Sequence, residues 1–292
     1  MTVYIFTGPT LLPTEGQRQL DAVFLPPVSQ GDVYRASLEN PRAIGIIDGY
    51  FERVPAVWHK EILWAMTQGI HVSGSASMGA LRAAELAPFG MRGVGTIFEA
   101  YRDGVLEDDD EVALTHGPED TGFRALSEPM VNIRRTLADA EAAHVLSVDT
   151  RAALERIAKA LFYPERSYLR ILRLGAERGL RPTELAALRR WLPGGHVNQK
   201  REDALAMLRV MREELAADPA PKRVSFTLEH THHWDCVMTE IAPLPPHGKQ
   251  SAVGKKKATG RRKPSRLRDL HIESARGDDA PAIKGGVPFS RG

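Results

Sequence analysis

Cysteine is nearly absent from this chain of 292 residues, since Cys236 is its single copy. One thiol excludes an internal disulfide framework and any zinc site that needs a pair of cysteine ligands. Long apolar runs are lacking as well, because no segment approaches the roughly 18 residues of a membrane-spanning helix. The first residues, Met-Thr-Val-Tyr-Ile, also lack the basic and then apolar order of a signal peptide. We therefore expect a cytoplasmic protein without a disulfide or a membrane segment.

Charge is spread unevenly along the chain. The formal net charge is +2, but residues 241–292 hold 12 Lys and Arg against 4 Asp and Glu, which leaves 27 and 33 for residues 1–240. The basic tail has little apolar periodicity, so it buries too little surface to offset its chain entropy, and we expect it to be disordered. Its basic clusters lack interleaved aromatic residues and a recognisable nucleic-acid-binding fold, which argues against nucleic acid as a partner.

The first part of the chain alternates short apolar strands with helices. The expected strands are 2–8, 22–25, 43–48 and 70–72, with 111–116 as a further candidate. The expected helices begin near Pro55 and at Ser77, and end before Gly69 and at Leu86. This strand–helix alternation predicts an α/β fold, with a mostly parallel sheet and helices on both faces.

From about residue 127 the pattern becomes helical. Leu and Ala alternate with Arg and Glu at helical spacing in 129–146, 149–162, 165–178, 182–192 and 200–216. The sequence therefore predicts an α/β core domain at 1–126, an all-helical region at 127–218, and a weakly structured to disordered basic tail at 219–292.

The segment 70–82 is the most informative for chemistry. A strand runs through small residues directly into a helix, so the first-turn amides of Met78 and Gly79 are expected to face the strand end and bind an anion or oxyanion. Residues 75–79 resemble the Gly-x-Ser-x-Gly nucleophile elbow with serine in place of the first glycine, which makes Ser77 a candidate nucleophile. The alternative is that Ser77 only caps its helix.

The same segment also resembles a phosphate-binding loop. Gly74 and Gly79 have the glycine spacing of a P-loop. Ala80 and Leu81 replace the Lys-Ser/Thr pair of that motif. The sequence therefore excludes nucleoside triphosphate binding at this turn.

A carboxylate and two histidines are candidate partners of Ser77. Asp48 ends an apolar strand, and ligands of open α/β sheets bind outside such strand ends, so Asp48 and Ser77 are expected to face one crevice. Asp48 could instead cap the following helix. His59, about one turn into its helix, and His116, at the end of the candidate strand, are alternative bases. A lone helical histidine is more often a surface or packing residue.

Other charged segments have simpler explanations. Arg82 lies close enough to its helix start to neutralise an anion, although an ion pair with Glu85 on the surface is the usual arrangement. The acidic run 107–111 could hold Mg²⁺, but we favour a solvated loop. The segment 230–236 contains His and Cys without a second spaced ligand pair. We therefore predict no metal and no cofactor.

Several segments resemble TfuA-like proteins. The resemblance covers residues 1–125 well and the helical part loosely. It is carried by 26–33, 48–63, 69–86, 89–95 and 101–113, including Asp48-Gly49-Tyr50-Phe51 and Ser77-Met78-Gly79-Ala80-Leu81-Arg82-Ala83-Ala84-Glu85-Leu86. The second of these runs is long enough to be specific.

The resemblance implies sulfur chemistry. TfuA-like proteins act beside YcaO enzymes, which phosphorylate a peptide-backbone amide and replace its oxygen with sulfur. The family is thought to release sulfide from a thiocarboxylated ubiquitin-like sulfur carrier of the ThiS type and to help YcaO engage its peptide. The implied partners are therefore a YcaO-type enzyme, the carrier and a substrate peptide.

The candidate site suits a thiocarboxylate, which is already anionic. A nucleophile can approach it only where cations or N–H dipoles surround it. Arg82, Lys60 and the amides of Met78 and Gly79 are the candidates for that role.

Catalysis would then involve the serine and a base. We expect Ser77 to attack or to position a water molecule. His59 or His116 would remove the proton, with Asp48 orienting the imidazole. Two alternatives stay open: a non-catalytic adaptor that docks carrier and peptide onto YcaO, and an ordinary serine esterase or amidase.

Overall fold

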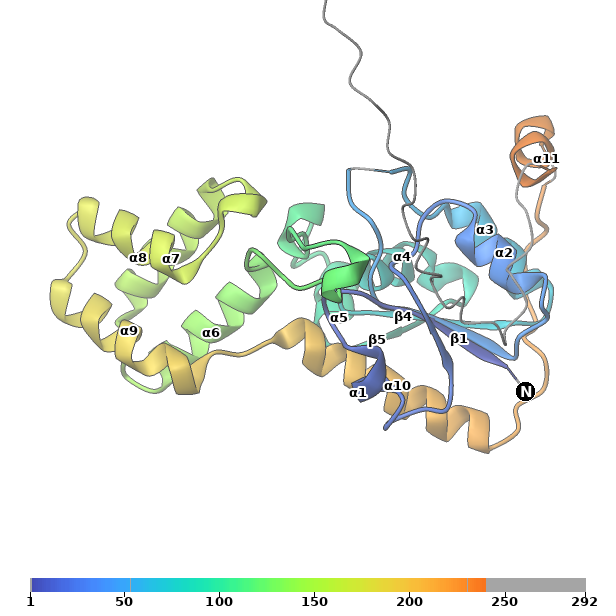
Figure 1. The fold of residues 1–292 in the computed structure, drawn as a ribbon, viewed down its shortest axis with the longest axis horizontal. Helices are drawn as coiled ribbons and strands as arrows, with labels where there is room; N and C mark the ends of the chain where they lie inside the picture. Colours follow the sequence, from blue (N-terminus) through green and yellow to red (C-terminus); the bar gives the residue numbers. More distant parts are fainter. Residues whose placement is uncertain (1, 53, 230, 240–292) are drawn as a thin grey trace, which may run out of the picture. The chain divides into compact units, whose positions relative to one another are not determined.

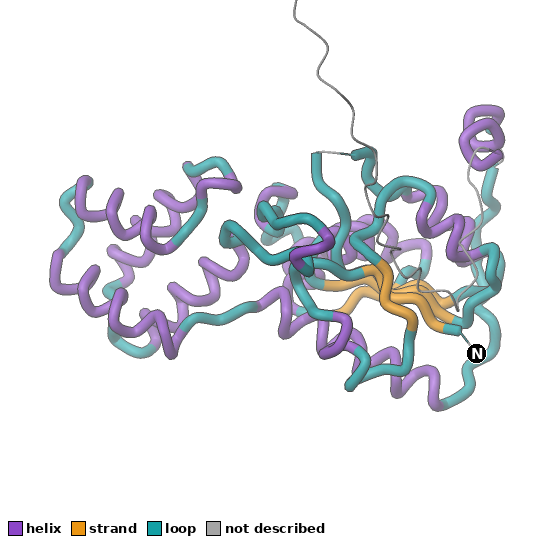
Figure 2. The backbone as a smooth tube through the Cα atoms, in the orientation of Figure 1, coloured by secondary structure: helices purple, strands orange, loops and turns teal. Residues whose placement is uncertain are grey.

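The computed structural model describes residues 2–52, 54–229 and 231–239. Its centre is an all-parallel sheet of five strands in the order β2-β1-β3-β4-β5 (Figures 1 and 2). The strands are β1 (Val3–Phe6), β2 (Val23–Leu25), β3 (Ala43–Ile46), β4 (His71–Ser75) and β5 (Arg92–Val94). This is the order of a doubly wound sheet, whose winding reverses between β1 and β3. The predicted α/β class is confirmed.

Helices cover both faces of this sheet (Figure 1). Those of the α/β part are α1 (Pro13–Gly16), α2 (Asp32–Ser37), α3 (His59–Thr67), α4 (Met78–Leu86) and α5 (Thr96–Arg102). Short 3-10 turns follow at η1 (Ala87–Phe89), η2 (Asp109–Glu111) and η3 (Glu119–Thr121). The candidate strand 111–116 is wrong, since it contains the end of η2 and a loop in which His116 makes a single bridge to Ala125.

The two faces of the sheet are built from alternate residues of each strand. On β1, Tyr4 and Phe6 pack with α2, α3 and α4, whereas Val3 and Ile5 pack on the opposite side. Side chains of a strand point alternately to its two faces, so a strand of apolar residues is buried on both. This explains why β1 and β3 are apolar at every position.

A separate helical bundle follows the α/β part. Its helices are α6 (Met130–Ala142), α7 (Val148–Ala160), α8 (Tyr168–Glu177) and α9 (Pro182–Gly195), with η4 (Tyr163–Glu165) between α7 and α8. They enclose a core of their own that includes Leu137, Leu154, Ile171 and Leu188. The predicted helical region is confirmed here.

Helix α10 (Gln199–Ala216) returns from the bundle to the sheet. Met207 and Met211 of α10 pack with Ile5 and Ala43 on the face opposite α2, α3 and α4. The sequence grouped this segment with the helical region, whereas its packing belongs to the sheet. A last helix, α11 (His232–Thr239), lies within the segment 219–292 that the sequence predicts to be weakly structured to disordered, and the predicted disorder of residues 241–292 lies outside the described part.

None of the helices in the described ranges has the length and apolar character that crossing a bilayer requires.

Candidate functional site

Ser77 lies at a tight turn between β4 and α4. Its amide donates a hydrogen bond to the carbonyl of Ser75 at 2.7 Å, and Ala76 between them has φ +66°. A three-residue turn with positive φ at a non-glycine centre is rare and strained. The Ser77 side chain makes no capping hydrogen bond to α4. Side-chain capping therefore does not explain this serine.

Two glycines bring α4 unusually close to the sheet. A Cβ on Gly79 would meet the carbonyl oxygen of Ile46 at 1.8 Å, and one on Gly74 would meet the carbonyl of Gly79 at 2.2 Å. The glycine spacing that resembles a P-loop is thus required by packing. The amide of Gly79 donates to the Ile47 carbonyl at 3.3 Å, which engages one of the two predicted anion-binding amides. The other, at Met78, has no partner within its helix.

Asp48 is buried just beyond the end of β3 and is held by the loop after β1. Its carboxylate accepts hydrogen bonds from the amides of Gly8 (2.9 Å) and Thr10 (3.0 Å) and from the Thr10 hydroxyl (2.6 Å). It does not cap the helix that follows it. Asp48 therefore ties together the ends of β1 and β3, the point at which the winding of the sheet reverses.

A buried lysine from α10 reaches the same point. The Lys200 side chain is 2% exposed, and its Nζ donates to the carbonyl of Val112 at 2.9 Å and lies 3.7 Å from Asp48 Oδ1. Burial lowers the pKa of Lys200, because the ammonium loses its hydration, and the charge of Asp48 offsets only part of this.

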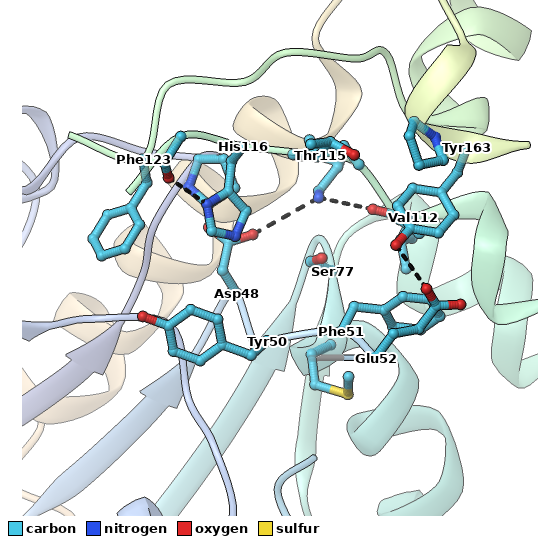
Figure 3. Close-up of a pocket in the computed structure, with 18 of the residues that line it drawn as sticks. Asp48, Tyr50, Phe51, Glu52, Ser77, Val112, Thr115, His116, Phe123 and Tyr163 are labelled. Carbon is cyan, nitrogen blue, oxygen red and sulfur yellow. Dashed lines mark hydrogen bonds and ion pairs between the residues drawn. The ribbon is translucent and has the colours of Figure 1, made fainter. Parts of the chain in front are cut away.

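These groups line one cavity of about 810 Å³ at the carboxyl edge of the sheet (Figure 3). Asp48, Ser77 and Lys200 form part of its wall, and the segment 112–119 forms another part. The rim carries aromatic side chains, namely Tyr50, Phe51, Phe123, Phe162 and Tyr163. The expectation that Asp48 and Ser77 face a common crevice thus agrees with the structure.

His116 is the predicted base that lines this cavity. Its Nδ1 lies 2.7 Å from the Gly117 carbonyl, and its ring lies 6.1 Å from Tyr50 and 5.6 Å from Phe123. A carbonyl oxygen can only accept a hydrogen bond, so Nδ1 must carry the hydrogen in this contact. In the neutral imidazole, Nε2 is then the acceptor. The hydrogen bonds of Asp48 go to the loop after β1 and not to this imidazole.

The other predicted base, His59, does not line this cavity. His59 is the first residue of α3, where the capping interaction between Trp58 and Glu61 begins the helix four residues later than the sequence suggested. The imidazole is 47% exposed and pairs with Glu85 at 2.7 Å. The sequence predicts that His59 lies near a helix start, but this position does not determine which way the side chain points.

The two predicted cations also lie elsewhere. Arg82 donates to the Val57 carbonyl at 3.0 Å and to Glu85 at 2.7 Å. Lys60 donates to Thr231 at 3.2 Å and lies 5.6 Å from the centre of the Trp234 ring. Neither is part of the cavity wall, so these side chains do not meet Ser77 there.

The acidic run forms an ion-pair network. The carboxylates of Asp108, Asp110 and Glu111 lie within 4.8 Å of one another. Lys159 Nζ contacts Asp108 at 2.9 Å, Glu111 at 3.0 Å and also Asp110. Arg134 binds Glu111 through two 2.9 Å hydrogen bonds. The interpretation as a solvated loop is wrong for Glu111, which is 3% exposed. The ammonium group of Lys159 occupies the position between the carboxylates that a metal cation would take.

Lys200 was missed because no motif contains it. A signal is nevertheless present, since Lys200, Ala204, Met207, Leu208 and Met211 recur at the spacing of one helix face. A lysine in register with an apolar helix face is a candidate for burial, provided that a partner meets its charge. That pattern could have identified a buried cation, but not its neighbours.

Part of the chain is similar to a known protein family. The model of the TfuA-like protein family matches residues 48–167. This range includes Asp48, Ser77 and His116, and it ends before Lys200. No curated protein matches the chain.

Proposed function

Because residues 48–167 of this chain are those of a TfuA-like protein, we propose that it delivers sulfur for peptide-backbone thioamidation. It hydrolyses a thiocarboxylated ubiquitin-like carrier of the ThiS type and releases sulfide for a YcaO-type enzyme. The observation that carries this proposal is the cavity at the carboxyl edge of the sheet, whose wall contains both a serine without a capping role and a buried lysine.

The cavity suits the end of a carrier tail. Its aromatic rim, where Phe162 is 60% exposed, offers apolar surface to an extended peptide. Farther in, the Met78 amide at the N-terminus of α4 supplies a dipole for a developing oxyanion. An anionic thiocarboxylate could therefore enter between the rim and Ser77.

Ser77 is the proposed nucleophile. Its Oγ attacks the thiocarboxylate carbon, the C–S bond breaks, and HS⁻ leaves an acyl-enzyme that water hydrolyses to the carboxylate. Overall, R–COS⁻ and water give R–COO⁻, HS⁻ and H⁺. The sequence proposed His59 or His116 as the base, and of these His116 lies in the cavity wall.

Sulfide release by the isolated protein tests the proposal. Purified protein is mixed with thiocarboxylated carrier in the absence of YcaO, and sulfide is measured over time. We expect Ser77→Ala to reduce the rate by more than about a thousandfold, as loss of a nucleophile does.

Ser75→Ala is the matched control. Ser75 is fully buried two residues away and does not line the cavity, so its loss should leave the rate near that of the unmodified protein. No sulfide from the unmodified protein would favour the adaptor, which docks the carrier and peptide onto YcaO without chemistry.

A further inference from the structure

The helices α8 and α9 form a pair to which the proposed function gives no role. Helix α8 ends at Glu177, residues 178–181 form the turn, and α9 begins at Pro182. A turn of about three or four residues that contains glycine is typical of the helix–turn–helix of DNA-binding proteins. Both helices lie beyond the segment 48–167 that matches the family model, so their role has to be inferred from their own residues.

Two glycines set the geometry of this pair. Gly179 in the turn has φ +76°, a conformation that glycine adopts at no steric cost. Gly175 is buried in α8 at a point where three segments meet. A Cβ there would lie 3.1 Å from Leu154 of α7, 3.2 Å from Leu180 of the turn and 3.4 Å from Leu185 of α9. The small residue lets α7, the turn and α9 pack tightly against α8, which fixes the direction of α9.

The outward face of α9 is small near its start and basic farther on. Leu185 and Leu188 belong to the core of the bundle, whereas Thr183, Ala186 and Arg190 are exposed. These three exposed residues recur at the spacing of one helix face. Figure 1 shows the turn between α8 and α9 at an outer end of the bundle. The first turns of α9 therefore present an exposed surface with little side-chain bulk.

Positive charge gathers on the same pair of helices. Residues 168–195 contain six arginines and two glutamates, and no lysine or aspartate. Arg173 and Arg181 remain 66% and 73% exposed although each lies beside a glutamate. Arg178, Arg189 and Arg190 are exposed and form no ion pair with a residue in the described part of the chain. Such an excess attracts an anionic surface.

We propose that α8 and α9 bind double-stranded DNA, with α9 in the major groove. The major groove of B-DNA admits an α-helix, and the phosphates that border it attract arginine. The deep, narrow major groove of A-form RNA does not admit side chains in this way. The proposal is independent of sulfide release. It departs from the sequence-based expectation that nucleic acid is not a partner, which rested on the basic tail.

An acidic protein surface is the alternative partner, because it also attracts arginine. A helix that docks in a protein groove presents a stripe of apolar anchors. The apolar side of α9 is instead used inside the bundle, where Leu185 and Leu188 pack with Leu154 and Ile171. What α9 leaves outside is small or basic, which suits a groove bordered by phosphates better than an apolar protein groove.

Fluorescence anisotropy with a fluorescein-labelled DNA duplex of random sequence tests the proposal. Every protein is full-length and carries glutamine in place of the basic residues at 255–257 and 261–263, so that the charge of the tail does not mask that of the helices. We expect a Kd of about 1–100 µM at physiological salt, and tighter binding at lower salt, as for binding without sequence preference.

Substitutions on α9 separate charge from shape. Arg189→Gln combined with Arg190→Gln should weaken binding at least about tenfold and lower the slope of log Kd against log salt by about 2. Ala186→Phe fills the small face without a change of charge, so binding should weaken about tenfold at an unchanged slope. The matched control is Arg209→Gln with Arg212→Gln, two exposed arginines of α10, which should change Kd less than about twofold.

Four results would overturn the proposal. They are the absence of duplex binding, an equal loss in the α9 and α10 double variants, unimpaired binding by Ala186→Phe, and binding of polyglutamate as tight as that of the duplex, which would assign the surface to an acidic protein. Urea unfolding checks that each variant is folded. Arg178→Gln, in the turn, replaces the α9 double variant if that one fails to fold, and should weaken duplex binding about threefold.

Discussion

Two lysines in this molecule lie beside carboxylates, and their surroundings differ. Lys159 of α7 contacts three carboxylates of the acidic run and is 29% exposed. Lys200 of α10 faces one carboxylate at 3.7 Å and is 2% exposed. Burial lowers the pKa of Lys159, but the hydrogen bonds that it donates to the acidic side chains outweigh this and raise it, whereas burial dominates and lowers the pKa of Lys200.

The difference is one between an ion-pair network that solvent reaches and a pair that is almost fully buried. A network in which every charge has partners joins η2 to α6 and α7 and holds the helical bundle on the α/β part. A buried charge costs stability, and it costs more once its partner is removed. The comparison predicts that the same substitution lowers stability by different amounts at the two lysines.

The largest effect is expected from removal of each lysine. Lys159→Met leaves three carboxylates facing one another, so the free energy of unfolding should fall by about 2–3 kcal/mol. Lys200→Met leaves the buried Asp48 carboxylate without its cation and the Val112 carbonyl without this donor, so its free energy of unfolding should fall further, by about 3–5 kcal/mol. Urea unfolding at neutral pH measures both. A loss in Lys200→Met no larger than that in Lys159→Met would show that Lys200 does not compensate the buried charge of Asp48.

A buried carboxylate without a cation sharpens this contrast. Glu61 accepts hydrogen bonds from four amides, those of Gly31, Val33, Tyr34 and Trp58. Burial nevertheless raises the pKa of Glu61 to about 7, against the amides that lower it. The folded protein then binds the proton more tightly than the unfolded chain, so the free energy of unfolding falls as pH rises from about 4.5 to 7.

Glu61→Gln should remove this dependence. The free energy of unfolding of the unmodified protein should decline by about 3 kcal/mol more than that of Glu61→Gln between pH 4.5 and 8. Unfolding by urea over this range compares the two proteins. Parallel pH curves would mean that the four amides fully offset the burial of the carboxylate.

Much of the fold could be predicted from the sequence because hydrophobic periodicity is a local property. The apolar run that contains β3 and the helical segments that contain α6 to α9 were found within a few residues. Strand β5 (Arg92–Val94) has only three residues and a glycine at its centre, so its hydrophobic pattern is too short to predict a strand. The return of α10 to the sheet depends on contacts between distant segments, which periodicity does not contain.

The site shows the same division. Asp48 and Ser77 were predicted together because the carboxyl ends of parallel strands share an edge. His59 and Arg82 were placed there as well, but the direction of a side chain at a helix start depends on tertiary packing, and both pair with Glu85. Lys200 needed the position of α10, which only the folded chain supplies.

A smaller effect is expected from acid on the Lys159 network. Burial raises the pKa values of Asp110 and Glu111, but hydrogen bonds from Lys159, Arg166 and Arg134 outweigh it and lower both. Their contribution is present above pH about 4.5 and is lost as pH falls through the lowered values. The free energy of unfolding should decline between pH 5 and 3, by about 1 kcal/mol more in the unmodified protein than in Lys159→Met. An equal pH dependence of the unfolding free energy in the two proteins would show that Lys159 does not stabilise these carboxylates.

The smallest effect concerns the turn that presents Ser77 to the cavity. Ala76 is fully buried and has φ +66°, a conformation that costs about 1 kcal/mol for alanine and little for glycine. Ala76→Gly relieves this strain but loses a buried methyl group worth about 0.8 kcal/mol, so the two terms nearly cancel.

Ala80→Gly is the control. This residue is fully buried inside α4, so its substitution loses a similar methyl group and also adds the cost of glycine in a helix, and it should destabilise the protein by about 1–2 kcal/mol. Thermal unfolding distinguishes the two, and an equal loss would show that the turn at Ala76 is not strained. Glycine also frees the backbone beside Ser77, so Ala76→Gly should slow sulfide release severalfold.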